Sequence, residues 1–382
     1  EHASPPSSLP AYVFRGPAYV TIRTRTNDQP KYVDTRLNVW TWYDGGTAMN
    51  IDWSGLKLSS EFVEIAKAFM AHMLEKYSPS TAYRAARMLH RVSESDISLK
   101  FPWAAEEIIS AFNSWNSSRE YVVVFRTLYR WVMDRGIAGF SNDIYLKIKD
   151  FKTERSSPYS RIFLSQSGLE LDEEILLLKR IERQSLTDSW EDVQFNIVLH
   201  LGFELAPRSI QFHSLDIADF EFIESADHEK YYTLWLPMAK KVGQRKPERR
   251  PRKITSRLGV KISRHILEIQ HRFGSGCEPL FVNPCGRRLS VSEIGSGLKH
   301  ELGEAGIDRP NQVSILLRHH LGQGLADQGT PADMIAELLG HNSTVAARAY
   351  VTATPNIARI KEKALGKSPA YQRIMRSLLT GK

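Results

Sequence analysis

The sequence predicts an α+β protein with a small β-rich segment, an all-helical domain and a larger mixed α and β domain. Residues 1–54 alternate in hydrophobicity, residues 59–135 follow a helical period, and strand-like segments lie among helical ones beyond a polar, basic stretch. At 382 residues the chain is long for one domain. The expected parts are 1–54, 55–152, a linker at 153–164, 165–355 and a tail at 356–382.

The composition favours a polyanionic partner. Lys plus Arg number 51 against 43 Asp plus Glu, a formal net charge of +8, which favours nucleic acid over a membrane surface. No apolar run approaches the ~18 residues of a membrane span, and EHASPPSSLP lacks the layout of a secretory signal. Cys277 and Cys285 lack the paired spacing of a zinc site, so we expect an intracellular protein without a metal.

Residues 1–54 are expected to form a small sheet. AYVTIRTRT and LNVWTWY alternate, and Asp44-Gly45-Gly46 supplies a turn before MNIDW. The segment is rich in arginine and aromatic residues. It could be an accessory DNA-binding module or a cap packed on the next domain, and the sequence leaves both open.

A helical period begins at Ser59 and stops before Pro79, with apolar residues at i, i+3, i+4 and i+7. Further helices are expected at roughly Ser80–Val92, Ala104–Trp115 and Ser118–Arg135. These helices predict a compact helical domain.

Two of these helices carry rows of arginine. The second places Arg84, Arg87 and Arg91 on one face, and the fourth places Arg126 and Arg130 one turn apart. Such rows can follow a phosphate backbone, although a solvated face explains each row equally well.

The stretch KDFKTERSSPYSR, at about 149–161, is typical of an interdomain linker. Beyond it, helices are expected near Asp172–Glu182 and Trp190–Leu205. Strands are then expected at LDIADFEFI, YYTLWLPM and RKITSRLGVKI, and helices from there to the C-terminus.

A basic segment joins the last two expected strands. It holds eight basic residues from Lys240 to Lys253 against one acid, Glu248. It is either an exposed loop or a hairpin that enters a DNA groove, with Lys241, Arg245 and Lys246 as candidate contacts.

The stretch LLGHNSTVAARAY joins two short helices near the end of the chain. Thr330 would cap the first helix and Gly340 would end it, so that His341 sits just past the helix end. Ser343 or Thr344 would cap the second helix, which carries Tyr350.

Together these segments resemble the tyrosine site-specific recombinases, the family of phage integrases and related transposon and chromosome-dimer enzymes. In that family a Leu-Gly-His box is followed after nine residues by the nucleophilic Tyr, as His341 and Tyr350 stand here. LGFELAPRSIQFHSLDIADF resembles the first arginine box, with Arg208, and SILLRHH the second, with Arg318. TLWLPMAK resembles the strand that delivers the hairpin lysine, Lys240, and PLFVNPCGRRLS resembles the connecting segment.

The resemblance covers roughly 165–355 and implies a tyrosine-recombinase catalytic domain behind a helical core-binding (SAM-like) domain. It implies an enzyme of the bacterial cytoplasm, associated with the nucleoid, that integrates, excises or transposes a mobile element. Tyr350 would attack a phosphodiester to form a 3′-phosphotyrosyl link, while Arg208 and Arg318 hold the non-bridging oxygens. Lys240 would protonate the leaving 5′-oxygen and His341 would bond the phosphate. Rejoining would need neither ATP, a metal nor another cofactor.

The partners that the resemblance implies are double-stranded DNA sites and further copies of the chain, a dimer on each site and a tetramer in synapsis. An accessory recombinase or a DNA-bending protein could assist. The amphipathic stretches NIARIKEKALG and PAYQRIMRSLL would dock on a neighbouring protomer or pack within the same chain.

Two positions depart from the family pattern. Ile315 stands where most members place a His that assists the tyrosine's proton transfer, and a general base typically contributes ~10² to 10⁴ in rate. Gln211 replaces the acidic residue three after the first arginine. An active recombinase remains the leading hypothesis if water or a neighbouring imidazole (His319, His320 or His341) takes the proton. The alternatives are a catalytically weak DNA-binding or assembly subunit and a type IB topoisomerase.

Overall fold

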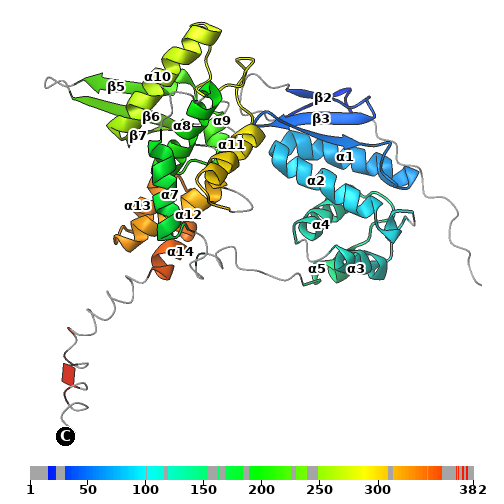
Figure 1. Cartoon of the computed structure of the whole chain (residues 1–382). Coiled ribbons are helices and arrows are strands. Elements are labelled where there is room, and N and C mark those ends of the chain that lie inside the picture. Colours follow the sequence, from blue (N-terminus) through cyan, green and yellow to red (C-terminus); the bar gives the residue numbers. More distant parts are fainter. Residues whose placement is uncertain are drawn as a thin grey trace, which may run out of the picture. The chain divides into compact units, whose positions relative to one another are not determined.

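The computed structural model divides the chain into two compact units, Glu1–Ser156 and Ser157–Lys382 (Figure 1). The structure describes residues 16–22, 31–99, 101–115, 119–152, 162, 168–183, 189–224, 229–238, 248–308, 313–341 and 343–354, with five positions between 367 and 376. Both units combine helices with small antiparallel sheets, which confirms the predicted α+β class.

The N-terminal unit begins with two antiparallel strand pairs. They are β1 (Tyr19–Thr21) with β2 (Tyr32–Asp34), and β3 (Val39–Asp44) with β4 (Thr47–Asp52). The turn between β3 and β4 consists of Gly45 and Gly46, with φ of 56° and 75°. Because both residues are left-handed, this is the two-residue turn that glycine favours in hairpins, at the position predicted from the sequence.

Helices make up the rest of this unit. They are α1 (Ser60–Lys76), α2 (Pro79–Ser93), η1 (Asp96–Leu99), α3 (Ala105–Ser114), α4 (Arg119–Met133) and α5 (Asn142–Lys149). The first four predicted α-helices are confirmed to within two residues at each end. Ser59 and Ser78 cap α1 and α2 by accepting hydrogen bonds from backbone amides, which explains where both helices begin.

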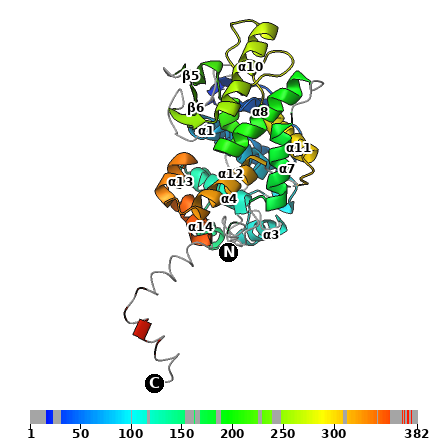
Figure 2. The same ribbon diagram turned by 60° about the vertical axis from the view of Figure 1, so that its left-hand side comes forward.

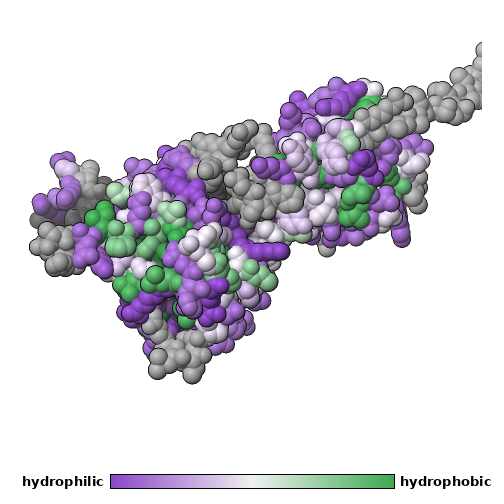
Figure 3. Space-filling model, turned by 90° about the horizontal axis from the view of Figure 1, so that it is seen from above, coloured by the Kyte–Doolittle hydropathy of each residue, from purple (hydrophilic) through white to green (hydrophobic). Residues whose placement is uncertain are grey.

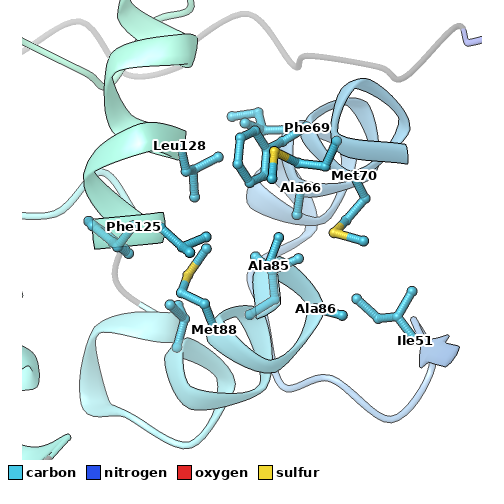
Figure 4. Packing of buried hydrophobic residues seen from close by; sticks show 14 of the residues in the cluster. Ile51, Ala66, Phe69, Met70, Ala85, Ala86, Met88, Phe125 and Leu128 are labelled. Carbon is cyan, nitrogen blue, oxygen red and sulfur yellow. The ribbon is translucent and has the colours of Figure 1, made fainter. Parts of the chain in front are cut away.

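The strands and helices of this unit share one core. Side chains from α1, α2 and α4 pack in one cluster that also includes Ile51 of β4, which lies near Ala86 of α2 (Figure 4). Trp40 and Trp42 are fully buried, and the indole Nε1 of Trp42 donates to the Pro79 carbonyl at 3.0 Å. The sheet therefore packs on the helices, as expected of a cap.

The C-terminal unit surrounds a three-stranded sheet and a central helix with further helices (Figures 1 and 2). The strands are β5 (Phe220–Glu224), β6 (Lys230–Pro237) and β7 (Arg249–Ile254), paired antiparallel in that order. The helices are α7 (Leu171–Glu182), α8 (Trp190–Leu205), α9 (Ser209–His213), η2 (Ile217–Asp219), α10 (Ser256–Phe273), α11 (Val291–Glu304), α12 (Val313–Asp327), α13 (Ala332–Leu338) and α14 (Val345–Ala353).

The central helix α8 organises this unit. Its residues Ile197, Val198, Leu199 and Leu201 are all almost fully buried, so the helix is apolar around much of its circumference. The helices α7 and α11 both pack on α8, and Arg180 of α7 forms a bidentate pair with the fully buried Glu301 of α11, at 2.9 and 3.0 Å. Two ionic hydrogen bonds satisfy a carboxylate that would otherwise be costly to bury.

One predicted strand was partly wrong. RKITSRLGVKI was expected to be a strand, but β7 ends at Ile254 and α10 begins at Ser256. The Thr255 hydroxyl accepts a hydrogen bond from the Leu258 amide, so Thr255 caps a helix. Leu258 and Ile262 are then buried one turn apart, a helical spacing that short-range alternation concealed.

One predicted cap was also wrong, and another was confirmed in position only. Thr330 lies one residue outside α13, whose N-cap is Pro331, and no side chain caps that helix. Thr344 occupies the N-cap position of α14 but makes no side-chain capping bond. The predicted strand LDIADFEFI is shorter than expected, because η2 precedes β5.

Several predictions fall outside the described residues. They include most of the 153–164 linker, the hairpin tip at 239–247 and most of the amphipathic stretches after residue 354. None of the described helices is both long and apolar enough to cross a bilayer. Figure 3 shows a largely hydrophilic surface interrupted by scattered hydrophobic patches.

Two glycines of α11 should respond oppositely to substitution by alanine. A Cβ at Gly297 would lie 2.1 Å from Cε1 of Phe195, whereas a Cβ at Gly295 meets nothing within 4 Å. We expect Gly297→Ala to destabilise the protein by roughly 1–3 kcal/mol through overpacking. Gly295→Ala should stabilise it by about 0.5–1 kcal/mol, because alanine has the higher helix propensity. Thermal unfolding followed by circular dichroism measures both, and equal shifts would contradict the α8–α11 packing.

Candidate active site

The site begins where α8 ends. Ala206 is the C-cap of α8 and has φ of 47°, the only non-glycine residue with positive φ in the described ranges. A left-handed alanine is strained, and its carbonyl accepts a hydrogen bond from Nη1 of Arg318 at 2.8 Å. Two residues later Arg208 is the N-cap residue of α9. The carbonyl of the strained residue thus binds Arg318, and Arg208 follows two positions later in the chain.

The C-terminal end of α13 holds both guanidinium groups. Nη2 of Arg318 donates to the Leu339 carbonyl, and Nη1 of Arg208 donates to the Gly340 carbonyl at 3.3 Å. Carbonyls at a helix C-terminus carry partial negative charge and attract cations. Arg208, from the α8–α9 turn, and Arg318, from α12, therefore converge on one helix end.

Neither arginine forms an ion pair with a carboxylate of the described residues. Arg318 is 6% exposed, and burial, followed by the charge of Arg208, lowers the pKa of Arg318 to about 9. Burial also lowers the pKa of Arg208. Arginine remains protonated in proteins, so a buried and a half-buried cation are neighbours without an anionic partner among the described residues, an arrangement that favours an incoming anion.

Gly340 and His341 lie beside the base of the basic hairpin. Gly340 has φ of 61°, and the His341 amide donates to the Ala336 carbonyl at 2.8 Å, which closes the end of α13. A Cβ at Gly340 would lie 3.3 Å from Cε of Met238. Met238 is the last described residue before the hairpin tip, and its amide donates to the Glu248 carbonyl at 2.7 Å. The hairpin therefore leaves the sheet next to this helix end.

Tyr350 of α14 packs against α12. Its side chain is 2% exposed and its hydroxyl lies 2.7 Å from Nδ1 of His319. The ring lies so close to Gly322 that a Cβ there would come within 2.7 Å of Cε2. The interaction of Tyr350 with Arg208 and Arg318 through charge raises the pKa values of both arginines, and so partly offsets the lowering caused by burial. The phenol is thus within electrostatic range of both cations.

Gln211 connects the two sides of the site. It is 4% exposed, its Oε1 accepts from the Arg208 amide at 3.0 Å, and its Nε2 donates to the Pro237 carbonyl at 2.8 Å. A carboxylate could accept the first bond but could not donate the second. The amide therefore joins the Arg208 turn to the end of β6 without adding a negative charge.

Glu337 joins α13 to β7. Its carboxylate lies 2.5 Å from Nη1 of Arg250 and 3.4 Å from Nη2 of Arg252. Nη2 of Arg252 also donates to the Glu337 backbone carbonyl at 2.6 Å. Two basic residues that the sequence assigned to the hairpin thus bind the helix whose end holds Arg208 and Arg318.

An open depression of about 420 Å³ lies beside the site. Its lining includes Ser209, Ser314, Lys299 and Ile315, and the Ser209 and Ser314 hydroxyls are 3.1 Å apart. Ile315 is 43% exposed, so it offers an aliphatic surface at the position where the family pattern has a histidine. Ser209, Ser314 and Lys299 were missed in the sequence, because no local motif distinguishes a lining serine or lysine.

The structure thus brings together Arg208, Arg318, His341, His319 and Tyr350 of the predicted site residues. Lys240, Lys241, Arg245 and Lys246 lie outside the described residues. Within the described ranges, no group of three or more His, Cys, Asp or Glu side chains could hold a metal ion.

The remaining predicted contacts belong to the N-terminal unit. Arg84, Arg87, Arg91 and Arg130 are exposed, and Arg87 and Arg91 each lie within 6.0 Å of the Tyr121 ring centre. Arg126 differs, because its Nε donates to the Ile148 carbonyl at 2.9 Å and its Nη2 to the Phe151 carbonyl. These bonds favour a structural role for Arg126.

No protein-family model matches the chain, and no curated protein matches its sequence. Solved structures match its fold. The XerH site-specific recombinase bound to palindromic difH substrate, a post-cleavage complex, aligns with a TM-score of 0.54 and 16% identity, over 82% of this chain and 91% of that one. The pre-cleavage complex of XerH with difH aligns with a TM-score of 0.52 and 15% identity, over 82% of this chain and 91% of that one.

The Tn1549 transposon integrase in complex with transposon right end DNA aligns with a TM-score of 0.53 and 13% identity, over 79% of this chain and 98% of that one. The chain therefore has the fold of these recombinases, which confirms the fold expected from the sequence resemblance.

Replacing Gln211 by glutamate should make stability depend on pH. Only a protonated carboxyl could keep the bond to the Pro237 carbonyl, and burial raises the pKa of a carboxyl. The folded state would then favour the protonated form, so the Gln211→Glu variant should lose stability as pH rises through that raised pKa. In denaturant unfolding, we expect the free energy of unfolding of Gln211→Glu to be lower than that of wild type by roughly 1–3 kcal/mol at pH 8. The difference should be smaller at pH 5. Gln211→Leu, the control, should show the same deficit at both pH values, and a pH-independent deficit for glutamate would contradict the assigned bonds.

Proposed function

We propose that the protein is a site-specific DNA recombinase, which cleaves and rejoins DNA through a 3′-phosphotyrosyl intermediate to integrate, excise or transpose a mobile element. The observation that carries this proposal is the convergence of two guanidinium groups, the buried Arg318 and the half-buried Arg208, within electrostatic range of Tyr350 and without a carboxylate partner among the described residues. The fold shared with recombinases crystallised on DNA supports it.

A DNA phosphate is the anion that this site would accept. Guanidinium groups donate two parallel hydrogen bonds to phosphate and keep their charge. Held in a protein interior, they stabilise the charge that gathers on the non-bridging oxygens as a nucleophile attacks. Arg208 and Arg318 have this role in the proposal, and His341, beside the same helix end, bonds the same phosphate.

Lys240 is the proposed general acid for the leaving 5′-oxygen. It lies outside the described residues, but it follows Met238 by two positions, and two residues span at most about 7 Å. Met238 lies against Gly340, next to the carbonyls that hold both arginines. This proximity supports delivery of the lysine to the same phosphate.

Tyr350 is the proposed nucleophile. Its oxygen would bond to phosphorus as the bond to the 5′-oxygen breaks, and a 5′-hydroxyl from another strand would reverse the step. The ester conserves the energy of the cleaved bond, so rejoining would need neither ATP nor a metal. Because Tyr350 is 2% exposed, its hydroxyl must become accessible when DNA binds. Exchange between two sites requires several protomers, so we propose a dimer on each site and a tetramer in synapsis.

Covalent trapping tests this function. Footprinting on the DNA that flanks the protein's own gene would first locate a binding site, and a nicked duplex of that sequence would then release a short fragment after cleavage and prevent rejoining. We expect a covalent protein–DNA adduct with the wild type and none with Tyr350→Phe, which removes the nucleophilic oxygen but should still bind DNA. Denaturing gel electrophoresis measures the adduct.

Tyr231→Phe is the matched control, because Tyr231 is 51% exposed on β6 and should not alter the adduct. A footprint without any adduct would instead indicate the DNA-binding or assembly subunit that Ile315 suggests. Relaxation of supercoiled plasmid lacking the site would indicate a topoisomerase.

The arginine row of α2 should bind DNA backbone. Arg87→Ala should weaken DNA binding at low salt and reduce the slope of log affinity against log salt by about 1, because one phosphate contact is lost. Fluorescence anisotropy with the footprinted duplex measures this. Arg126→Ala, the control, should lower the unfolding temperature, because two backbone carbonyls lose their donors, while the salt slope of the folded protein stays unchanged. An unchanged slope for Arg87→Ala would contradict the contact.

A further inference from the structure

The hydroxyl of Tyr350 has an imidazole partner. Nδ1 of His319 lies 2.7 Å away, and the two rings meet edge to face, with their centres 5.7 Å apart and an interplanar angle of 60°. His319 is half-buried, whereas Tyr350 is 2% exposed. A proton on the phenol oxygen is thus within hydrogen-bond reach of a group that can bind it.

The position that the family pattern gives to a histidine offers no such group. Ile315 is aliphatic and lines the depression next to Ser209 and Ser314. Residues 315 and 319 are four apart on α12, so they lie on adjacent turns of the same helix face. The imidazole stands one turn further along α12, against Tyr350.

The packing of α14 on α12 fixes this pair. His319 and Gly322 are three residues apart and share a face of α12, and the absence of a side chain at Gly322 admits the Tyr350 ring. Beyond the ring, the Thr354 hydroxyl donates to the Asp327 carboxylate and fastens the end of α14 to the end of α12. The contact between hydroxyl and imidazole therefore follows from the packing of α14 on α12 at the Tyr350 ring and at the C-terminal end of α14.

We infer that His319 is the general base that takes the proton of Tyr350 when the phenol attacks the DNA phosphate. This inference rests on the proposed recombinase function. As the bond from the Tyr350 oxygen to phosphorus forms, the proton moves from that oxygen to Nδ1 of His319, and the bond from phosphorus to the 5′-oxygen breaks. The leaving oxygen takes a proton from Lys240. In the rejoining step the proton on His319 returns to the Tyr350 oxygen, and the proton of the attacking 5′-hydroxyl returns to Lys240.

The charges around the pair suit this role. Nδ1 must be unprotonated to accept, so Nε2 carries the ring proton in the reactive tautomer. Among the described residues, Arg318, which precedes His319 on α12, and Arg208 both interact with Tyr350 through charge. They stabilise the developing phenolate and disfavour a lasting imidazolium, so the proton is held only briefly.

Two substitutions at position 319 test the base, on the nicked duplex described above. His319→Ala should form the covalent adduct roughly 10² to 10⁴ times more slowly than wild type, with unchanged DNA affinity, and added imidazole should restore part of the rate. His319→Gln keeps a hydrogen bond to the hydroxyl but cannot take the proton at neutral pH, so it should be equally slow. In both variants the rate should lose the dependence on pH between about 5 and 8 that a titrating imidazole gives.

A modified substrate separates the base from the acid. A duplex with sulfur in place of the 5′-bridging oxygen has a leaving group that needs no proton. It should restore the rate of Lys240→Ala and leave His319→Ala slow. Ile315→His in the wild-type background should leave the rate unchanged, because the base is already present.

Three results would overturn the inference: a wild-type rate for His319→Gln, restoration of His319→Ala by the sulfur substrate, or acceleration by Ile315→His. In each of these cases the proposed function still holds if the wild type forms the adduct and Tyr350→Phe does not. Absence of any wild-type adduct overturns both the function and the base.

Discussion

Two neighbouring like charges, one buried and one half-buried, are the constraint on which the candidate site depends. Arg208 and Arg318 repel each other, and the described residues offer them backbone carbonyls in place of a carboxylate. Those carbonyls point to the guanidinium groups because the chain turns left-handed at Ala206 and at Gly340. The strain at Ala206 is thus part of the cost of keeping two cations ready for an anion.

The amide of Gln211, in place of a carboxylate, helps to keep the site positively charged. A carboxylate beside Arg208 would neutralise part of the charge that the site presents, and would repel the Pro237 carbonyl to which the amide donates. Gln211 orders the backbone of Arg208 and the end of β6 through neutral hydrogen bonds. The positive potential therefore remains available for a ligand.

Much of this could be predicted from the sequence, because helical periods and turn residues act locally. The helices from Ser60 to Met133, the Gly45-Gly46 turn and the central helix α8 follow directly from such signals. The start of α10 was missed because one capping bond at Thr255 outweighs the β propensity of its neighbours. Spacing also predicted Arg208, Arg318 and Tyr350 as site residues. It could not reveal that carbonyls hold the arginines, nor choose among the three candidate histidines, since both depend on contacts between distant segments.

The ion pairs of Glu337 with Arg250 and Arg252 connect β7 to α13. β7 is one leg of the basic hairpin, and α13 ends in the carbonyls that orient both arginines. These contacts connect the strand to the helix end that holds both guanidinium groups. A displacement of β7 would therefore also displace the two cations that α13 positions.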